Sequence, residues 1–164
     1  MKFDEPQALS NVAEFHDTFD LPIKSNPAVP DDDRCRLRLN LIEEELNELK
    51  QAIQQKDLVE IADAFCDLQY VLSGAILEFG MGSKFRSLFE EVQRSNMSKI
   101  CRSMNEAQAT LDHYHHNKQT AGIIVEKGEH FLVYRTEDGK VLKSINYSEA
   151  DLEAILDIPA TIEE

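Results

Sequence analysis

The chain has 164 residues and a formal net charge of −14, with 42% hydrophobic and 29% charged residues. This length suits one domain with a substantial core, and the composition is ordinary for a soluble protein. The acidic balance argues against nucleic acid as a generic partner, because neutralising its phosphates requires basic patches. A nucleotide is still compatible with this charge, since a bound metal ion can invert the local potential.

The cysteines and the apolar runs narrow the class of protein further. The three cysteines are widely spaced and form no C-x-x-C pair, so neither a zinc site nor a disulfide framework is indicated. The N-terminal residues lack an apolar signal region, and no uninterrupted apolar run approaches about 18 residues. We therefore expect no membrane partner and a location in the reducing cytoplasm.

The N-terminal part predicts one helix followed by a loop. Residues 6–20 have helical periodicity, with Ser10 or Asp4 as alternative N-caps. One side of this helix carries apolar side chains and a histidine: Leu9, Val12, Phe15, His16 and Phe19. Residues 21–33 contain three prolines, which predicts an ordered loop. The acids at 31–33 suit the positive N-terminal end of the following helix.

Two acidic helices are expected next, at about 33–55 and 58–79, with Asp57 capping the second. The first has an apolar stripe formed by Ile42, Leu46, Leu49 and Ile53. Glu45 lies on this stripe, Glu48 lies at its edge and Glu44 lies one step further out. A solvated charge run is the simpler interpretation of three consecutive glutamates. It suits Glu43, but it suits Glu45 poorly.

Carboxylates also share one face of the second acidic helix, whose other faces are apolar. At about 100° per residue, four of them fall within an arc of about 60°: Glu60, Asp63, Asp67 and Glu78. No Lys or Arg occurs between Lys56 and Lys84, so these acids lack a local ion-pair partner. Clustered carboxylates repel one another and are costly to desolvate. Two antiparallel helices of this kind can hold Mg²⁺ or Mn²⁺; a solvated groove is the alternative.

Two further helices are expected at 84–97 and 105–117, the second capped by Ser103 or Asn105. Asn96 and Lys99 close the first of these. They suit either a triphosphate beside an acidic metal site or ordinary contacts with the helix dipole. The histidines that end the second, His113, His115 and His116, have no partner motif and fit solvated residues better than metal ligands.

The composition then changes to β-branched and aromatic alternation, which predicts two or three antiparallel strands at about 121–126, 130–136 and 140–145. A short final helix capped by Ser148 follows, and the end from 159 onward is expected to fray. We expect a mainly α fold in a single domain. Its helical metal-binding core spans 1–117, and its β-hairpin and short-helix appendage spans 118–164.

The acidic pattern resembles that of a known superfamily. E-E-x-x-E (Glu44, Glu45, Glu48), a short spacer and E-x-x-D (Glu60, Asp63) resemble the MazG-like, all-α nucleoside triphosphate pyrophosphohydrolases over about residues 37–80. E-V-Q-R-S-N-M-S-K at 91–99 resembles a segment of the branch called phosphoribosyl-ATP-pyrophosphohydrolase-like, and D-G-K-V-L-K-S at 138–144 resembles the tail of that branch. No role in histidine biosynthesis is inferred from the branch name.

The resemblance implies Mg²⁺-dependent hydrolysis of a nucleoside triphosphate to a monophosphate and pyrophosphate, by attack of water on the α-phosphorus. The implied metal ligands are Glu45, Glu48, Glu60 and Asp63, with Asp67 as a further ligand or a supporting carboxylate. Glu44 is implied as the base that orients water. The implied phosphate contacts are Asn96 and Lys99, with Arg94, Lys140 and Lys143 as additional candidates. In the superfamily the first helix helps to close the base pocket, so His16 and Phe19 become candidate neighbours of the nucleobase.

Assembly and alternative functions complete the expectations. The two acidic helices leave broad apolar sides uncovered, so we expect a homodimer or larger homo-oligomer, as in the superfamily. A non-catalytic helical interaction protein is the alternative function, although such a protein would not require buried acids. A ferritin-like dimetal oxidant would use Glu-x-x-His pairs, and none lies on these helices.

Overall fold

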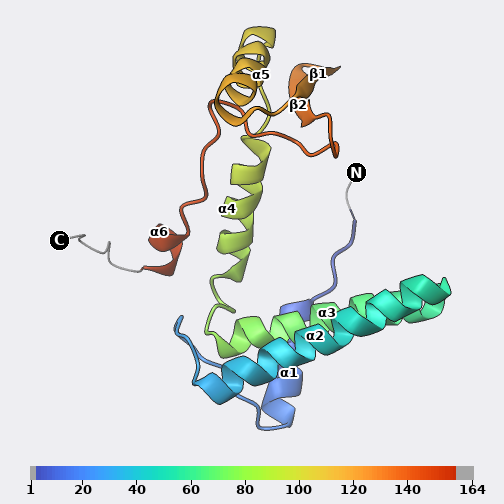
Figure 1. Ribbon diagram of the computed structural model, residues 1–164. Coiled ribbons are helices and arrows are strands. Elements are labelled where there is room, and N and C mark those ends of the chain that lie inside the picture. The colour runs from blue at the N-terminus through green and yellow to red at the C-terminus, as the bar shows by residue number, and fades with distance from the viewer. Residues whose placement is uncertain (1–2, 158–164) are drawn as a thin grey trace. The chain divides into compact units, whose positions relative to one another are not determined.

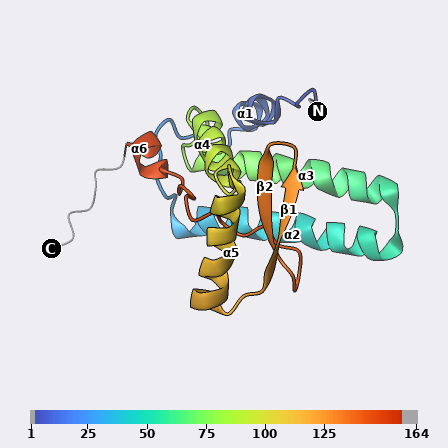
Figure 2. The same ribbon diagram turned by 90° about the horizontal axis from the view of Figure 1, so that it is seen from above.

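The computed structural model describes residues 3–157 as a mainly helical chain with a two-stranded antiparallel sheet near the C-terminus (Figures 1 and 2). This confirms the predicted fold class. The chain divides into two compact units, Met1–Phe85 and Arg86–Glu164. The predicted subdivision at residue 117 does not coincide with this division, because α4 and α5 belong to the same unit as the sheet.

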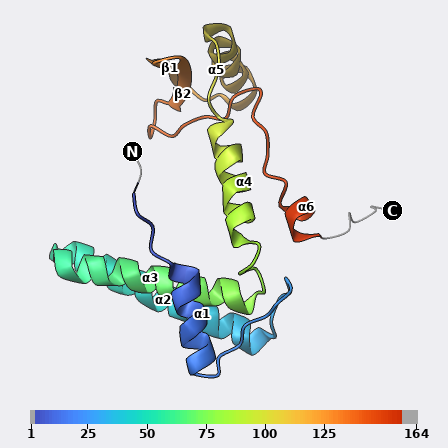
Figure 3. The ribbon, with the colours of Figure 1, turned by 180° about the vertical axis from the view of Figure 1, so that it is seen from behind.

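The first unit is built on a helical hairpin of α2 (Asp32–Gln55) and α3 (Leu58–Glu78), which run side by side (Figures 1 and 3). The side chain of Asp57 accepts hydrogen bonds from the backbone nitrogens of Val59 and Glu60 at 3.0 and 3.3 Å, which confirms it as the predicted cap of α3. Asp31 caps α2 in the same way, through the nitrogen of Arg34 at 3.0 Å. These two caps fix where the acidic helices begin, and so which of their residues face each other.

Helix α1 (Ala8–Thr18) packs against α3 and buries Val12 and His16. It begins after Gln7, which makes no side-chain capping bond. Both caps predicted for this helix are therefore wrong: Ser10 lies inside the first turn, and Asp4 lies too far before it.

The proline-containing loop that follows α1 is fastened to the end of α3. The backbone nitrogens of Lys24 and Ala28 donate to the carbonyls of Leu77 and Phe79, both at 3.1 Å. Gly80 is required at this junction, since its φ is +71° and a β-carbon there would lie 1.9 Å from the carbonyl oxygen of Asn26. The predicted loop is thus ordered by backbone hydrogen bonds.

The second unit contains α4 (Phe85–Met97, which begins at the boundary), α5 (Met104–Lys118), β1 (Gly122–Lys127), β2 (His130–Arg135) and α6 (Leu152–Leu156). Its core forms where α5 packs on the β-hairpin of β1 and β2, around Cys101, Ala107, Val133 and Leu142. Ser103 caps α5 through the nitrogen of Glu106 at 3.1 Å, which decides between the two predicted caps.

The third predicted strand is reduced to a single bridge between Tyr134 and Val141. Beyond this bridge the backbone bonds to side chains of α5: Lys143 donates to the Tyr114 hydroxyl at 3.2 Å, and Ile145 donates to the Thr110 hydroxyl at 3.1 Å. Because these donors point to a helix, the segment cannot extend the sheet.

Helix α6 is capped by Asp151, whose side chain accepts from the nitrogen of Ala154 at 3.2 Å. The predicted cap Ser148 is wrong, since its backbone instead bonds to Ser98, the residue that follows α4. The segment from 159 onward, which was predicted to fray, lies outside the described residues.

Candidate functional site

Acids from α2 and α3 converge on Glu45 in the first unit. Burial raises the pKa of the Glu45 carboxyl, and four neighbouring carboxylates raise it further, Asp67 most, followed by Glu48, Glu44 and Asp63. Two of these acids come from the facing helix α3, as the sequence predicted. Glu60 is not one of the four acids that raise this pKa most. It lies exposed in the first turn of α3, beside the Asp57 cap.

Cations do not compensate this acidic cluster, which we define as Glu44, Glu45, Glu48, Asp63 and Asp67. Among residues 3–157, no lysine or arginine makes an ion pair or hydrogen bond with any of the five or with Glu60. Carboxylate oxygens are the donors that Mg²⁺ prefers, so the chemistry of this cluster fits that ion. Within the same described residues, no three acidic, histidine or cysteine side chains already form a metal-binding group.

Glu78 departs from the prediction made for its arc of acids. It is 1% exposed and accepts hydrogen bonds from two arginines of α2. Arg38 donates to Glu78 Oε1 at 2.5 Å, and Arg34 donates through Nε to Oε2 at 3.1 Å and through Nη2 to Oε1. Burial by itself raises the pKa of Glu78, but the bonds from Arg34 and Arg38 outweigh it and leave the pKa below its usual value. The expectation that Glu78 lacks a cation is wrong, because its partners lie 40 and 44 residues away in the sequence.

The buried ion pairs continue to α1 through a histidine. Arg38 Nη2 lies 3.1 Å from His16 Nε2, and His16 Nδ1 lies 3.0 Å from the carbonyl oxygen of Pro22. Since that carbonyl can only accept, Nδ1 carries the proton and Nε2 accepts from Arg38. His16 is therefore a neutral, packed histidine with both nitrogens engaged.

A pocket of about 300 Å³ opens beside this group. It is lined by residues of α1, α2 and α3 and of the loop after α1: Val12, Phe15, His16, Leu21, Arg34, Leu37, Arg38, Leu41, Tyr70 and Val71. Of the predicted substrate residues only His16 is among them, and the two arginines were missed. Their i, i+4 spacing on α2 is the signal that could have found them, because it places both on one helix face.

Gly74 makes room for the guanidinium of Arg38. A β-carbon at this position of α3 would lie 2.7 Å from Arg38 Nη1 and 3.0 Å from His16 Nε2. A glycine inside a helix costs about 1 kcal/mol relative to alanine. Here it allows α3 to approach a buried charge that a methyl group would displace.

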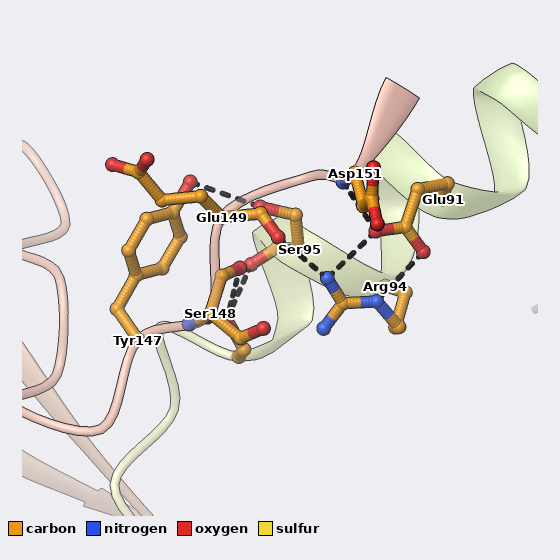
Figure 4. Close-up of polar contacts among 8 residues, drawn as sticks. Glu91, Arg94, Ser95, Tyr147, Ser148, Glu149 and Asp151 are labelled. Atoms are coloured by element: carbon orange, nitrogen blue, oxygen red, sulfur yellow. Dashed lines mark hydrogen bonds and ion pairs between the residues drawn. The ribbon is translucent and has the colours of Figure 1, made fainter. Parts of the chain in front are cut away.

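The second unit holds the predicted phosphate contacts. Arg94 directs Nε and Nη2 to Glu91 at 2.7 Å each, and donates to the carbonyl of Glu149 at 2.8 Å (Figure 4). Its hydrogen bonds, together with one from the nitrogen of Asp151, lower the pKa of Glu91 to about 2. Arg94 is thus committed to contacts with its own chain.

One face of α4 holds the segment 147–151, which we call the strap (Figure 4). The Ser95 and Tyr147 hydroxyls lie 2.9 Å apart, and Ser98 Oγ both accepts from the nitrogen of Ser148 at 2.9 Å and donates to its carbonyl at 3.2 Å. The E-V-Q-R-S-N-M-S stretch therefore has a structural task in addition to any contact with substrate.

Asn96, Lys99 and Lys143 have weaker attachments. Lys99 Nζ donates to Asn96 Oδ1 at 2.7 Å on an exposed face. Lys143 Nζ lies 4.1 Å from the centre of the Tyr147 ring and 3.8 Å from Glu149 Oε1. These residues belong to the second unit, whereas the acidic cluster belongs to the first.

Comparison with known proteins identifies the family to which this chain belongs. The family model for phosphoribosyl-ATP pyrophosphohydrolase matches residues 12–96, more than half of the chain. The chain therefore belongs to this family, which is part of the MazG-like nucleoside triphosphate pyrophosphohydrolase superfamily. The matched stretch contains the acidic cluster and the arginine-lined pocket, and it ends before Lys99. This confirms the resemblance indicated by the acidic pattern.

One curated relative is the uncharacterized protein L479 of Acanthamoeba polyphaga mimivirus, 35% identical over 69 residues. The match covers 39% of this chain and 28% of the viral protein, so the chain spans only a minority of that protein's length. No helix formed by residues 3–157 is both long and apolar enough to cross a membrane.

Proposed function

We propose that the chain hydrolyses a nucleoside or deoxynucleoside triphosphate to the monophosphate and pyrophosphate, with Mg²⁺ as cofactor and Mn²⁺ as an alternative. The observation that carries this proposal is the convergence of carboxylates from α2 and α3 on Glu45 without a lysine or arginine partner among the described residues. Like charges gathered between two helices without cationic partners are stabilised when a divalent cation binds. Membership of a pyrophosphohydrolase family supports the same conclusion.

In this proposal Glu45, Glu48 and Asp63 hold Mg²⁺, with Glu60 and Asp67 as the flanking ligands. When bound, Mg²⁺ supplies neutralisation of the triphosphate charge. Glu44, an exposed member of the cluster, accepts a proton from the attacking water. The water oxygen forms a bond to the α-phosphorus, the bond from that phosphorus to the bridging oxygen breaks, and pyrophosphate leaves with the electron pair.

Phosphate contacts are assigned to Asn96, Lys99 and Lys143. Lys99 and Asn96 bind each other on an exposed face, so both are available to an anionic ligand once their own bond opens. Arg94 is a less suitable donor, because Glu91 and Glu149 already occupy it. Its hydrogen bonds hold the strap against α4.

The active form is a homodimer or larger homo-oligomer. In the single chain, several large apolar side chains of α2 and α3 are exposed, among them Leu39 at 67%, Leu58 at 77%, Val59 at 76% and Phe65 at 57%. Apolar patches of this kind mark association surfaces. A second copy that covers them would also close the acidic helices against water.

A nucleotide panel with Mg²⁺ tests the reaction. We expect release of pyrophosphate and a nucleoside monophosphate, with the oxygen of ¹⁸O-labelled water found in the monophosphate. Label in pyrophosphate would mean attack on the β-phosphorus. Release of a nucleoside diphosphate and orthophosphate would overturn the proposal, and so would an absence of turnover with every nucleotide.

A further inference from the structure

The pocket beside the buried arginines has no task in the acid chemistry. Its walls are mostly apolar or aromatic, including Phe15, Leu37, Tyr70 and Val71, and its volume is about 300 Å³. Ligand pockets are lined mostly by apolar and aromatic side chains and orient their ligand through a few fixed polar groups, which suits a nucleobase ring. The polar groups therefore decide which ring is accepted.

The inner polar groups of this pocket donate hydrogen bonds and have little capacity left to accept them. Both oxygens of Glu78 already accept from guanidinium groups, and both nitrogens of His16 are engaged. Arginine has only donors. Arg38 Nε is buried and has no hydrogen-bond partner among the described residues. Tyr70, 39% exposed, adds a hydroxyl that can either donate or accept.

The net charge of these polar groups also favours a ligand that accepts hydrogen bonds. The group contains two guanidinium cations, one carboxylate and a neutral histidine, so a positive charge is left over. Arg38 is 6% exposed, and a buried guanidinium with an unsatisfied N–H favours a ligand that brings an oxygen acceptor.

The pocket lies next to the acidic cluster along both helices. Leu41, in the pocket, and Glu45 are four residues apart on α2, and Val71 and Asp67 are four residues apart on α3. Each step is one helical turn, about 6 Å, on a single helix face. A base in the pocket can therefore be joined through its sugar to phosphates at the acidic cluster.

We propose that the pocket formed by α1, α2 and α3 selects nucleobases that present a carbonyl oxygen, such as uracil, thymine, hypoxanthine or guanine, over bases that present an amino group at the same position. The selecting group is the Arg34–Glu78–Arg38 ion pair network, with Arg38 as the inner donor. This inference rests on the proposed nucleotide hydrolysis and assigns the base class that the hydrolysis uses.

Two matched substrate pairs test the selection with the unmodified full chain. dUTP and dCTP differ at the 4-position in oxo against amino, and dITP and dATP differ in the same way at the 6-position. We expect kcat/KM with Mg²⁺ to favour the oxo member of each pair by about tenfold or more, the value of one hydrogen bond to a charged group. Equal kcat/KM values within both pairs, or a preference for the amino members, would overturn the inference and leave the hydrolysis intact.

A Gly74→Ala variant tests whether Arg38 is responsible. Its added methyl group would lie 2.7 Å from Arg38 Nη1, so we expect the oxo preference to fall several-fold. Gly82→Ala is the matched control, because its β-carbon would meet only the flexible end of Leu77, at 3.0 Å. An undiminished oxo preference in a folded Gly74→Ala protein would contradict the role of Arg38.

Binding of monophosphates separates the pocket from the reaction. Calorimetric titration with dUMP and dCMP should show tighter binding of dUMP, whether or not any triphosphate is hydrolysed. Binding of dUMP without turnover of any nucleotide would support the pocket and defeat the proposed function. Turnover with equal binding of dUMP and dCMP would do the reverse.

Discussion

The two halves of the α2–α3 hairpin treat their carboxylates in opposite ways: Glu78 is buried, whereas Glu45 is half-buried and Glu48 and Asp63 are exposed. At one end Glu78 is 1% exposed and is bonded to Arg34 and Arg38, so its charge is satisfied within the chain. Toward the middle, Glu45 is surrounded by four further acids and has no lysine or arginine partner among the described residues. A carboxylate that is paired with arginines of the same chain serves the fold. Carboxylates without such partners are suited to an external cation.

The largest effect is expected from removing an acid from the cluster, which tests whether its carboxylates bind a metal ion. Glu48→Gln or Asp63→Asn should lower the rate of pyrophosphate release at least about 100-fold, because a lost ligand should cost no less than a lost supporting contact. The far-ultraviolet circular dichroism should stay unchanged.

Glu43→Gln is the matched control for these variants, since Glu43 is exposed and lies outside the cluster. It should retain turnover close to that of the unmodified protein. Full turnover in Glu48→Gln and Asp63→Asn would contradict the assignment of the cluster to metal binding.

The opposite end of the hairpin should respond in stability. Glu78→Leu leaves two guanidinium groups without their shared carboxylate, and we expect a loss of about 3–5 kcal/mol in the free energy of unfolding by urea. Glu43→Gln should stay within about 0.5 kcal/mol of the unmodified protein.

A double variant tests whether the charges at this end act as one unit. Arg38→Met combined with Glu78→Leu should lose less than the sum of the two single changes, because neither then leaves the other charge unpaired. Simple additivity would show that the pairing contributes little to stability.

Assembly is the next largest effect, and it concerns the apolar side of the same two helices. Light scattering at micromolar concentration should give at least twice the chain mass of 18.7 kDa. Phe65→Glu, at a side chain 57% exposed in the single chain, should shift the protein toward the monomer. A monomer for the unmodified protein would show that these apolar side chains do not form a subunit interface.

The smallest effect concerns acid conditions. The pKa of Glu78 is lowered in the folded chain, so the stability it contributes is full above the unfolded value, about 4.3. That stability is lost as the pH falls through the lower folded value. The melting temperature should therefore decline below about pH 4.3, and less steeply in Glu78→Gln than in the unmodified protein. Parallel declines would show that other groups govern acid unfolding.

Local features of this chain could be predicted, and long-range pairings could not. The Asp57 cap, the Ser103 cap and the strands β1 and β2 follow from signals within a few residues. The ion pairs of Glu78 join residues 40 and 44 positions apart, and no local pattern contains that information. The acids that converge on Glu45 were found because the facing helices are consecutive in the chain.

Other errors arose where competing side chains decide the outcome. Ser148 and Asp151 are both suitable helix caps, and the contact between Ser148 and Ser98, just after α4, leaves the capping role to Asp151. The third strand was lost in a similar way, since Tyr114 and Thr110 take the backbone donors that a sheet would need.

The strap along α4 has a consequence for local opening. It is held by side chains of Glu91, Arg94 and Ser98, which bond to its backbone. Such side-chain contacts can be broken one region at a time, whereas the amides within α4 are held by a continuous helical ladder. The amide hydrogens of Ser148 and Asp151 should thus exchange with deuterium through a low-energy opening of the strap, long before the helix to which it is bound unfolds.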